Sequence, residues 1–166
     1  MRSVIVVASV FTALAALAAS GIAVASPGHA PGEGHGHSVE KAYGKPGDPK
    51  KPARIIQIVM RESDGKMLFL PDKIKIRKGE QIRFQLRNNG VLDHEIVLAT
   101  LAENMEHMKE MAKNPDMEHD DPNAKRLKPK GTGEIVWQFT KAGTFDFSCL
   151  IPGHRESGMF GTIVVE

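Results

Sequence analysis

Hydrophobic and polar residues alternate along the middle of the chain. Ile74 and Ile76 alternate with basic residues, a turn follows at residues 78–80, and the alternation then resumes. The apolar positions after the turn are Ile82, Phe84 and Leu86. A repeat of two residues is typical of a strand that buries one face and exposes the other. The pattern therefore predicts two consecutive strands, the second ending at the turn of residues 88–90.

Further short segments have the character of strands. They are residues 54–60, 66–70, 95–98, 134–139, 144–148 and 161–165. About eight short strands in this spacing predict an all-β fold, either a sandwich or a Greek-key barrel. Two aromatic pairs share a face of their strands, Trp137 with Phe139 and Phe145 with Phe147. We expect both pairs to fill the core between two sheets.

One segment has the period of a helix instead. Thr100-Leu101-Ala102-Glu103 fits a capping box at a helix start. The apolar residues of the segment fall on one helical face, which we expect to pack on the core: Leu101, Met105, Met108 and Ala112. The polar stretch at residues 114–130 is expected to be a loop. The pattern thus predicts a helical insertion at about residues 99–130 within a domain at residues 54–166.

The first 25 residues have the pattern of a secretory signal peptide. Arg2 precedes an apolar run, and Ala23-Val24-Ala25 forms a small-x-small cleavage site. An uncleaved membrane anchor is the alternative, but the run is shorter than the ~20 residues that a span needs. We expect an exported chain that begins at Ser26, lies in an oxidising compartment and does not stay in the membrane.

Residues 26–53 are rich in glycine, proline and charge, and almost without large apolar side chains. Such a segment cannot bury enough surface to order itself, so it is expected to be a flexible arm. The arm contains His29, His35 and His37. Histidine-rich tracts bind copper or zinc, but the same histidines could be incidental residues of a solvated linker. Both interpretations stay open.

Composition and charge exclude several functions. The 166 residues carry 22 Lys and Arg against 20 Asp and Glu, a formal charge of only +2. Nucleic acid as the main partner is not expected, because binding phosphates needs a concentrated basic face. One cysteine excludes an internal disulfide framework and a four-cysteine zinc site. A lone thiol in an exported chain needs a specific reason to be there.

The candidate chemistry lies near the C-terminus. Cys149, His154 and Met159 are spaced five residues apart in one predicted loop between the last two strands. A thiolate, an imidazole and a thioether form a soft ligand set that selects copper. The trigonal blue-copper site needs a second histidine, and His94 supplies one at the start of a predicted strand.

These residues resemble the cupredoxins, the type 1 copper proteins that include plastocyanin, azurin and rusticyanin. The resemblance covers residues 55–166 and rests on His94, on Phe-Ser-Cys at 147–149, on Pro-Gly-His at 152–154 and on Gly-Met-x-Gly at 158–161. It implies a Greek-key sandwich with copper held by His94, Cys149, His154 and, axially, Met159. The ligand-loop spacing looks more like rusticyanin than plastocyanin. The predicted signal peptide, the histidine-rich start and the Met/His insertion look similar to those of small periplasmic cupredoxins of copper-resistance operons, the CopI type.

One position departs from the family pattern. Many cupredoxins have asparagine directly after the first histidine ligand, where it ties the two ligand loops together. Here that position is Glu95. The hydrogen bonding around the thiolate therefore cannot be transferred from the family.

The insertion suggests a second copper site. His107 and Met111 lie four residues apart on the predicted helix, and Met117 and His119 follow in the polar loop. Thioethers favour Cu(I), and imidazole binds either copper state. Core packing of the helical methionines and a merely solvated insertion are the alternatives.

Copper handling in the periplasm, with Cu(I)/Cu(II) cycling, is the function that these features favour. A dedicated soluble one-electron carrier is the alternative. An enzyme is not expected, because a multicopper oxidase needs more histidine clusters and a thiol oxidoreductase usually a second cysteine. We expect a monomer whose partners are redox proteins or copper donors and acceptors.

Overall fold

The computed structural model describes residues 40–114 and 121–166. Within these ranges the chain forms ten strands and one helix. In chain order they are β1 (Lys45–Pro46), β2 (Arg54–Ser63), β3 (Lys66–Leu70), β4 (Lys73–Ile76), β5 (Gln81–Asn88), β6 (His94–Ala99), α1 (Leu101–Lys113), β7 (Ala124–Leu127), β8 (Thr132–Gln138), β9 (Gly143–Ser148) and β10 (Phe160–Val165). In the part described, no helix is long and apolar enough to cross a membrane.

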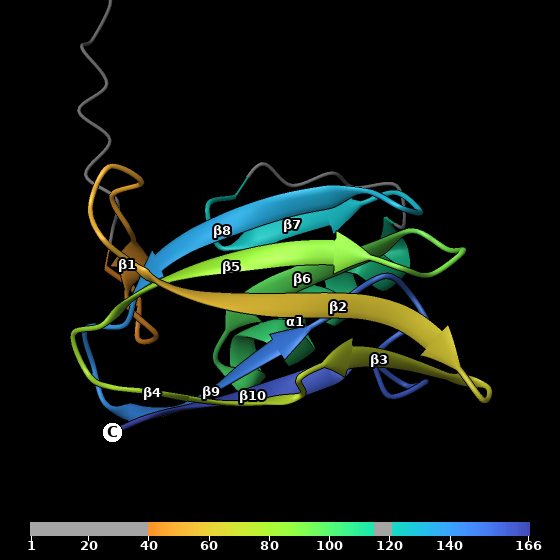
Figure 1. Ribbon diagram of the computed structural model, residues 1–166. Coiled ribbons are helices and arrows are strands. Elements are labelled where there is room, and N and C mark those ends of the chain that lie inside the picture. The colour runs from red at the N-terminus through yellow and green to blue at the C-terminus, as the bar shows by residue number, and fades with distance from the viewer. Residues whose placement is uncertain (1–39, 115–120) are drawn as a thin grey trace, which may run out of the picture. The chain divides into compact units, whose positions relative to one another are not determined.

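The strands form two five-stranded sheets that pack as a sandwich (Figure 1). One sheet has the order β1-β8-β5-β2-β3 and the other the order β4-β10-β9-β6-β7. β2 pairs with β5, and β4 with β10, in parallel. The other neighbouring strands are antiparallel. The predicted all-β sandwich is confirmed, and each of its eight expected strands is present.

The alternating residues occupy the positions that their period predicts. The apolar members of β4 and β5 are buried, and their basic neighbours are largely exposed. The two predicted aromatic pairs lie in the main core with Phe69 and Phe84. Phe84 meets Phe139 edge to face, with ring centroids 6.2 Å apart, and Phe69 lies 5.2 Å from Phe147.

The folded unit begins before residue 54, the boundary that the sequence predicted. Residues 40–53 were expected to belong to a flexible arm, but β1 pairs with β8 and Tyr43 is only 4% exposed. The Tyr43 ring stacks on Trp137 at 5.4 Å, and Trp137 Nε1 donates to the Tyr43 carbonyl at 2.8 Å. Aromatic stacking, strand pairing and hydrogen bonds to Val136 and Gln81 thus anchor the segment. The predicted signal peptide and the histidines of the predicted arm, His29, His35 and His37, lie outside the described residues.

The predicted start of α1 is confirmed, but its predicted buried face is wrong. Thr100 and Glu103 form the reciprocal capping box. Three of the expected core residues, Leu101, Met105 and Ala112, are exposed, whereas Asn104 and Met111 are fully buried. Asn104 is buried because its amide donates to the Val97 carbonyl and to a buried aspartate. The buried face of the helix thus carries Asn104, Met108 and Met111, and a polar contact and a small apolar cluster together set the rotation of the helix.

The stretch at residues 114–130 is not wholly a loop, because it contains β7. β7 pairs antiparallel with β6, and His94 lies opposite Leu127 in the register. β6 is buried along its whole length. Ile96 and Leu98 belong to the main core, while Val97 packs with Met111 and Leu150 in a second, smaller cluster that includes α1. Cover on both faces makes β6 a firm support for His94.

We predict that Tyr43→Ala lowers the free energy of unfolding by about 3 kcal/mol, because truncating a buried aromatic leaves a cavity. Urea unfolding of the metal-free protein measures the change. The control is Lys50→Ala, an exposed position in the same segment, expected to change stability by less than about 0.5 kcal/mol. A change in stability for Tyr43→Ala as small as that for the control would contradict the inclusion of residues 40–53 in the folded unit.

Candidate metal centre

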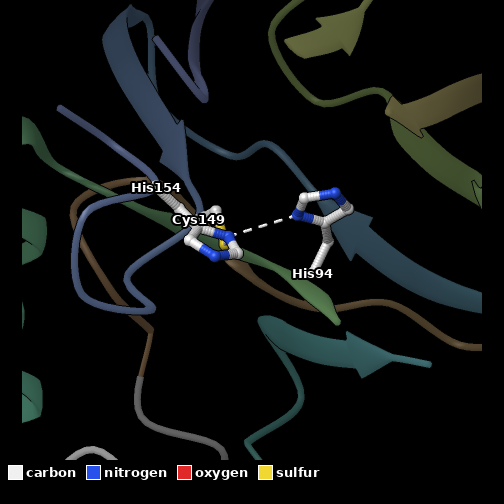
Figure 2. A group of neighbouring side chains, drawn as sticks. All are labelled: His94, Cys149 and His154. Atoms are coloured by element: carbon white, nitrogen blue, oxygen red, sulfur yellow. Dashed lines mark hydrogen bonds between the residues drawn. The ribbon is translucent and has the colours of Figure 1, made fainter. Parts of the chain in front are cut away.

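Three predicted ligands converge at one end of the sandwich. One ligand atom from each of His94, Cys149 and His154 lies within 4.8 Å of the others. Cys149 Sγ is 3.3 Å from His154 Nδ1, and the two histidine Nδ1 atoms are 3.2 Å apart (Figure 2). His94 and Cys149 are fully buried, and His154 is 9% exposed.

A turn built on Asn88 delivers His94 to this cluster. Asn88 is fully buried at the end of β5. Its Nδ2 donates to the carbonyls of Leu92 and Leu127, and its Oδ1 accepts from the Gly90 amide. These three bonds hold the loop between β5 and β6 in one shape. The first residue of β6 is therefore aimed at the C-terminal loop.

The loop between β9 and β10 carries the other predicted ligands and is closed by its own backbone. The Cys149 amide donates to the Met159 carbonyl at 3.0 Å, and the Met159 amide to the His154 carbonyl at 3.1 Å. The Met67 amide at the edge of β3 donates to Ser157 in the same loop. Met159 is fully buried. The backbone thus brings all three loop residues to the end of β9 and β10.

Glu95 connects the two ligand-bearing segments, although many cupredoxins have asparagine at this position. Its amide donates to Cys149 Sγ at 3.4 Å, and its side-chain Oε1 accepts from the Leu150 amide at 3.0 Å. Glu95 is only 4% exposed. A carboxylate therefore joins the strand of one histidine to the loop of the other.

A buried aspartate fixes the far side of the same loop. Asp146 accepts from both terminal nitrogens of Arg155, at 2.9 and 3.1 Å, and from Ser148 Oγ at 2.6 Å. Asn104 of α1 donates to the same carboxylate at 2.7 Å. Arg155 directly follows His154, so this network connects α1, β9 and the histidine-bearing loop.

Burial favours the uncharged forms of Cys149 and His154. Burial raises the pKa of Cys149 to about 12. Burial, together with the adjacent His94, lowers the pKa of His154. The two Nδ1 atoms and the thiol sulfur each have a lone pair that can bind a proton or a metal ion. The three side chains contact one another and the Glu95 amide, and with their protons removed they would offer three lone pairs to one metal ion. Two imidazoles and a thiolate match the equatorial donor set of a blue-copper site.

Glu62 at the end of β2 is a site residue that sequence reasoning missed. Its Oε1 lies 2.9 Å from His94 Nε2, and its carboxylate also accepts from the amides of Val91 and Leu92. Burial alone would raise the pKa of Glu62, but these hydrogen bonds outweigh burial and hold the pKa below its ordinary value. A sequence signal existed, because Glu62 continues the inward-facing positions Ile58 and Met60.

The second predicted copper site stays a prediction. Met111 is fully buried beside Val97 and Leu150, and His107 is half-buried on the same helix. Met117 and His119 lie outside the described residues.

The family model for copper binding proteins of the plastocyanin/azurin type matches residues 56–166. This chain belongs to that family. The match spans β2 to β10, and the predicted cupredoxin assignment, with copper as its cofactor, is confirmed.

Curated relatives agree with this assignment. A protein of Rubrivivax gelatinosus named copper-resistant cuproprotein CopI is 49% identical over 131 residues, which cover 79% of this chain and 78% of the relative. A protein of the same name from Pseudomonas aeruginosa is 34% identical, with 76% and 83% covered.

Solved structures agree on the fold. The reduced auracyanin of Roseiflexus castenholzii superposes with a TM-score of 0.57 at 24% identity, covering 70% of this chain and 99% of auracyanin. Auracyanin B superposes with a TM-score of 0.58 at 22% identity, with 70% and 91% covered. At this level of identity the likeness concerns the fold alone.

We predict that Asp146→Ala lowers the free energy of unfolding of the metal-free protein by about 3 kcal/mol, because it leaves the guanidinium of Arg155, whose side chain is only 12% exposed, without its carboxylate. Urea unfolding measures the loss. The control is Glu134→Ala, which removes an ion pair of similar length, 2.7 Å between Glu134 and Arg83. The Glu134 side chain is 50% exposed. That pair should contribute less than about 1 kcal/mol. A small effect of Asp146→Ala would mean that the network does not stabilise the loop.

Proposed function

We propose that this cupredoxin handles copper in the periplasm and contributes to copper tolerance, using one mononuclear type 1 site. The observation that carries the proposal is the buried cluster of one thiol and two imidazole nitrogens. Three curated relatives share the name copper-resistant cuproprotein CopI, which supports the proposal. These names favour copper handling over the alternative of a dedicated electron carrier.

The residues proposed to hold the copper are Cys149, His94, His154 and Met159. Three of them lie on one closed loop, and Met159 is buried beside the backbone bonds that close it. Cys149 must give up its proton to bind a metal, and two backbone amides support the resulting charge, those of Glu95 and Ile151. Bound copper would supply one-electron redox chemistry, while the residues around it hold the ligands in place.

The role proposed here is binding and electron exchange rather than catalysis. The ligand atoms lie under the surface, and His154 is the most exposed of the three clustered residues. Partners would therefore be redox proteins or copper donors and acceptors that approach the His154 loop. Periplasmic location follows from the proposed signal peptide at residues 1–25.

We predict that Cys149→Ser abolishes the intense thiolate-to-copper charge-transfer band and the copper tolerance that the wild-type chain confers on a copper-sensitive host. The substitution removes the sulfur ligand but little volume, so the β circular-dichroism signal should persist. Visible absorption after addition of Cu(II), growth in graded copper and an immunoblot for protein level are the measurements.

The absorption band tests whether the type 1 site forms, and growth in copper tests whether that site confers tolerance. Loss of the band with full tolerance would contradict the proposal that the type 1 site confers resistance, and would direct attention to the second predicted site. Loss of the β signal would contradict the expectation that the fold forms without the thiol.

A further inference from the structure

The carboxylate of Glu62 gathers three donors from the segment that leads into β6. It accepts from the Val91 amide at 3.0 Å and the Leu92 amide at 3.0 Å, and its Oε1 lies 2.9 Å from His94 Nε2. The side chain is 25% exposed, so it lies partly out of solvent beside a fully buried imidazole. One side chain of β2 thus contacts both the loop and the ligand that the loop delivers.

The fold is built to admit this carboxylate. In β2 the residues that point inward are Ile58 and Met60, and Glu62 is the next position of the same face. A Cβ atom placed on Gly90 would collide with the Glu62 carboxylate. The absence of a side chain at position 90 therefore lets the acid approach the loop backbone closely.

The contact determines which nitrogen of His94 carries a proton. A charged carboxylate can only accept hydrogen bonds, so His94 Nε2 must donate to Glu62. The neutral ring then has its lone pair on Nδ1. That atom is the one that lies 3.2 Å from His154 Nδ1, inside the ligand cluster.

The geometry points to Glu62 as the positioning residue of the metal centre, one that fixes His94 with Nδ1 free for the metal and favours the oxidised over the reduced ion. The inference rests on the proposed function, because it assumes that the cluster binds copper. Carboxylate partners of metal-binding histidines fix the tautomer and raise the basicity of the ligand. A negative charge beside a ligand also stabilises Cu(II) more than Cu(I), because Cu(II) carries the larger positive charge.

The test is Glu62→Gln in the full chain loaded with copper, with the reduction potential as the readout. Glutamine keeps the size of the side chain and an oxygen acceptor but removes the charge. We expect the ratio of Cu(II) to Cu(I) affinity to fall about tenfold, so the potential rises by about 59 mV for a one-electron couple. The charge-transfer band should persist.

The matched control is Glu80→Gln. Glu80 is also 25% exposed and also accepts from a backbone amide and a side chain, those of Arg77 and Arg54. It lies at the turn before β5, whereas the loop to His94 follows the other end of that strand. Its substitution removes the same charge far from the cluster and should leave the potential unchanged.

The outcomes separate this inference from the proposed function. No thiolate band in the wild-type protein would overturn the proposed function. A band in all three proteins with equal potentials, or equal shifts in both variants, would overturn the role of Glu62 alone.

A second measurement needs no metal. Nitrogen-15 NMR of the histidine rings in the metal-free wild-type protein should show His94 protonated at Nε2, and Glu62→Ala should lose this preference. Protonation of His94 at Nδ1 in the wild-type protein would overturn the inference even if Glu62→Gln does not fold.

Discussion

The constraint on which this structure depends is the confinement of three lone-pair-bearing atoms in a buried space. Cys149 Sγ and the two Nδ1 atoms of His94 and His154 lie 3.2–3.3 Å from their neighbours. Such groups are costly to bury unless their lone pairs are satisfied. Each of the three atoms accordingly has a hydrogen-bond partner, and the sandwich holds them together with strands that are buried and braced.

Carboxylates do most of the bracing. Glu62 holds the loop before His94, Glu95 joins β6 to the loop of Cys149, and Asp146 joins that loop to α1 through Arg155. Each of them accepts from a backbone amide or a charged side chain, and such bonds are stronger than neutral ones. The helical insertion thus takes part in positioning the centre, since Asn104 of α1 contacts the same aspartate as Arg155.

Local patterns were sufficient for much of this architecture. The period of two in the chain predicted the strands of both sheets, and the spacing of Cys149 and His154 with the upstream His94 predicted the residues that converge. What failed depended on contacts distant in sequence. β1 is held by the stacking of Tyr43 on Trp137, and Asn104 is buried because of Asp146. Glu62 gave a weak signal as an acid on an inward face, but its partner 32 residues away could not be inferred.

The central claim is that copper binds to Cys149, His94 and His154. X-ray absorption at the copper edge of the full protein, loaded with one equivalent of copper, tests it most directly. The account predicts one short copper–sulfur bond together with two imidazole nitrogens. A spectrum with only nitrogen and oxygen donors would contradict it, because copper would then lie away from the buried thiol.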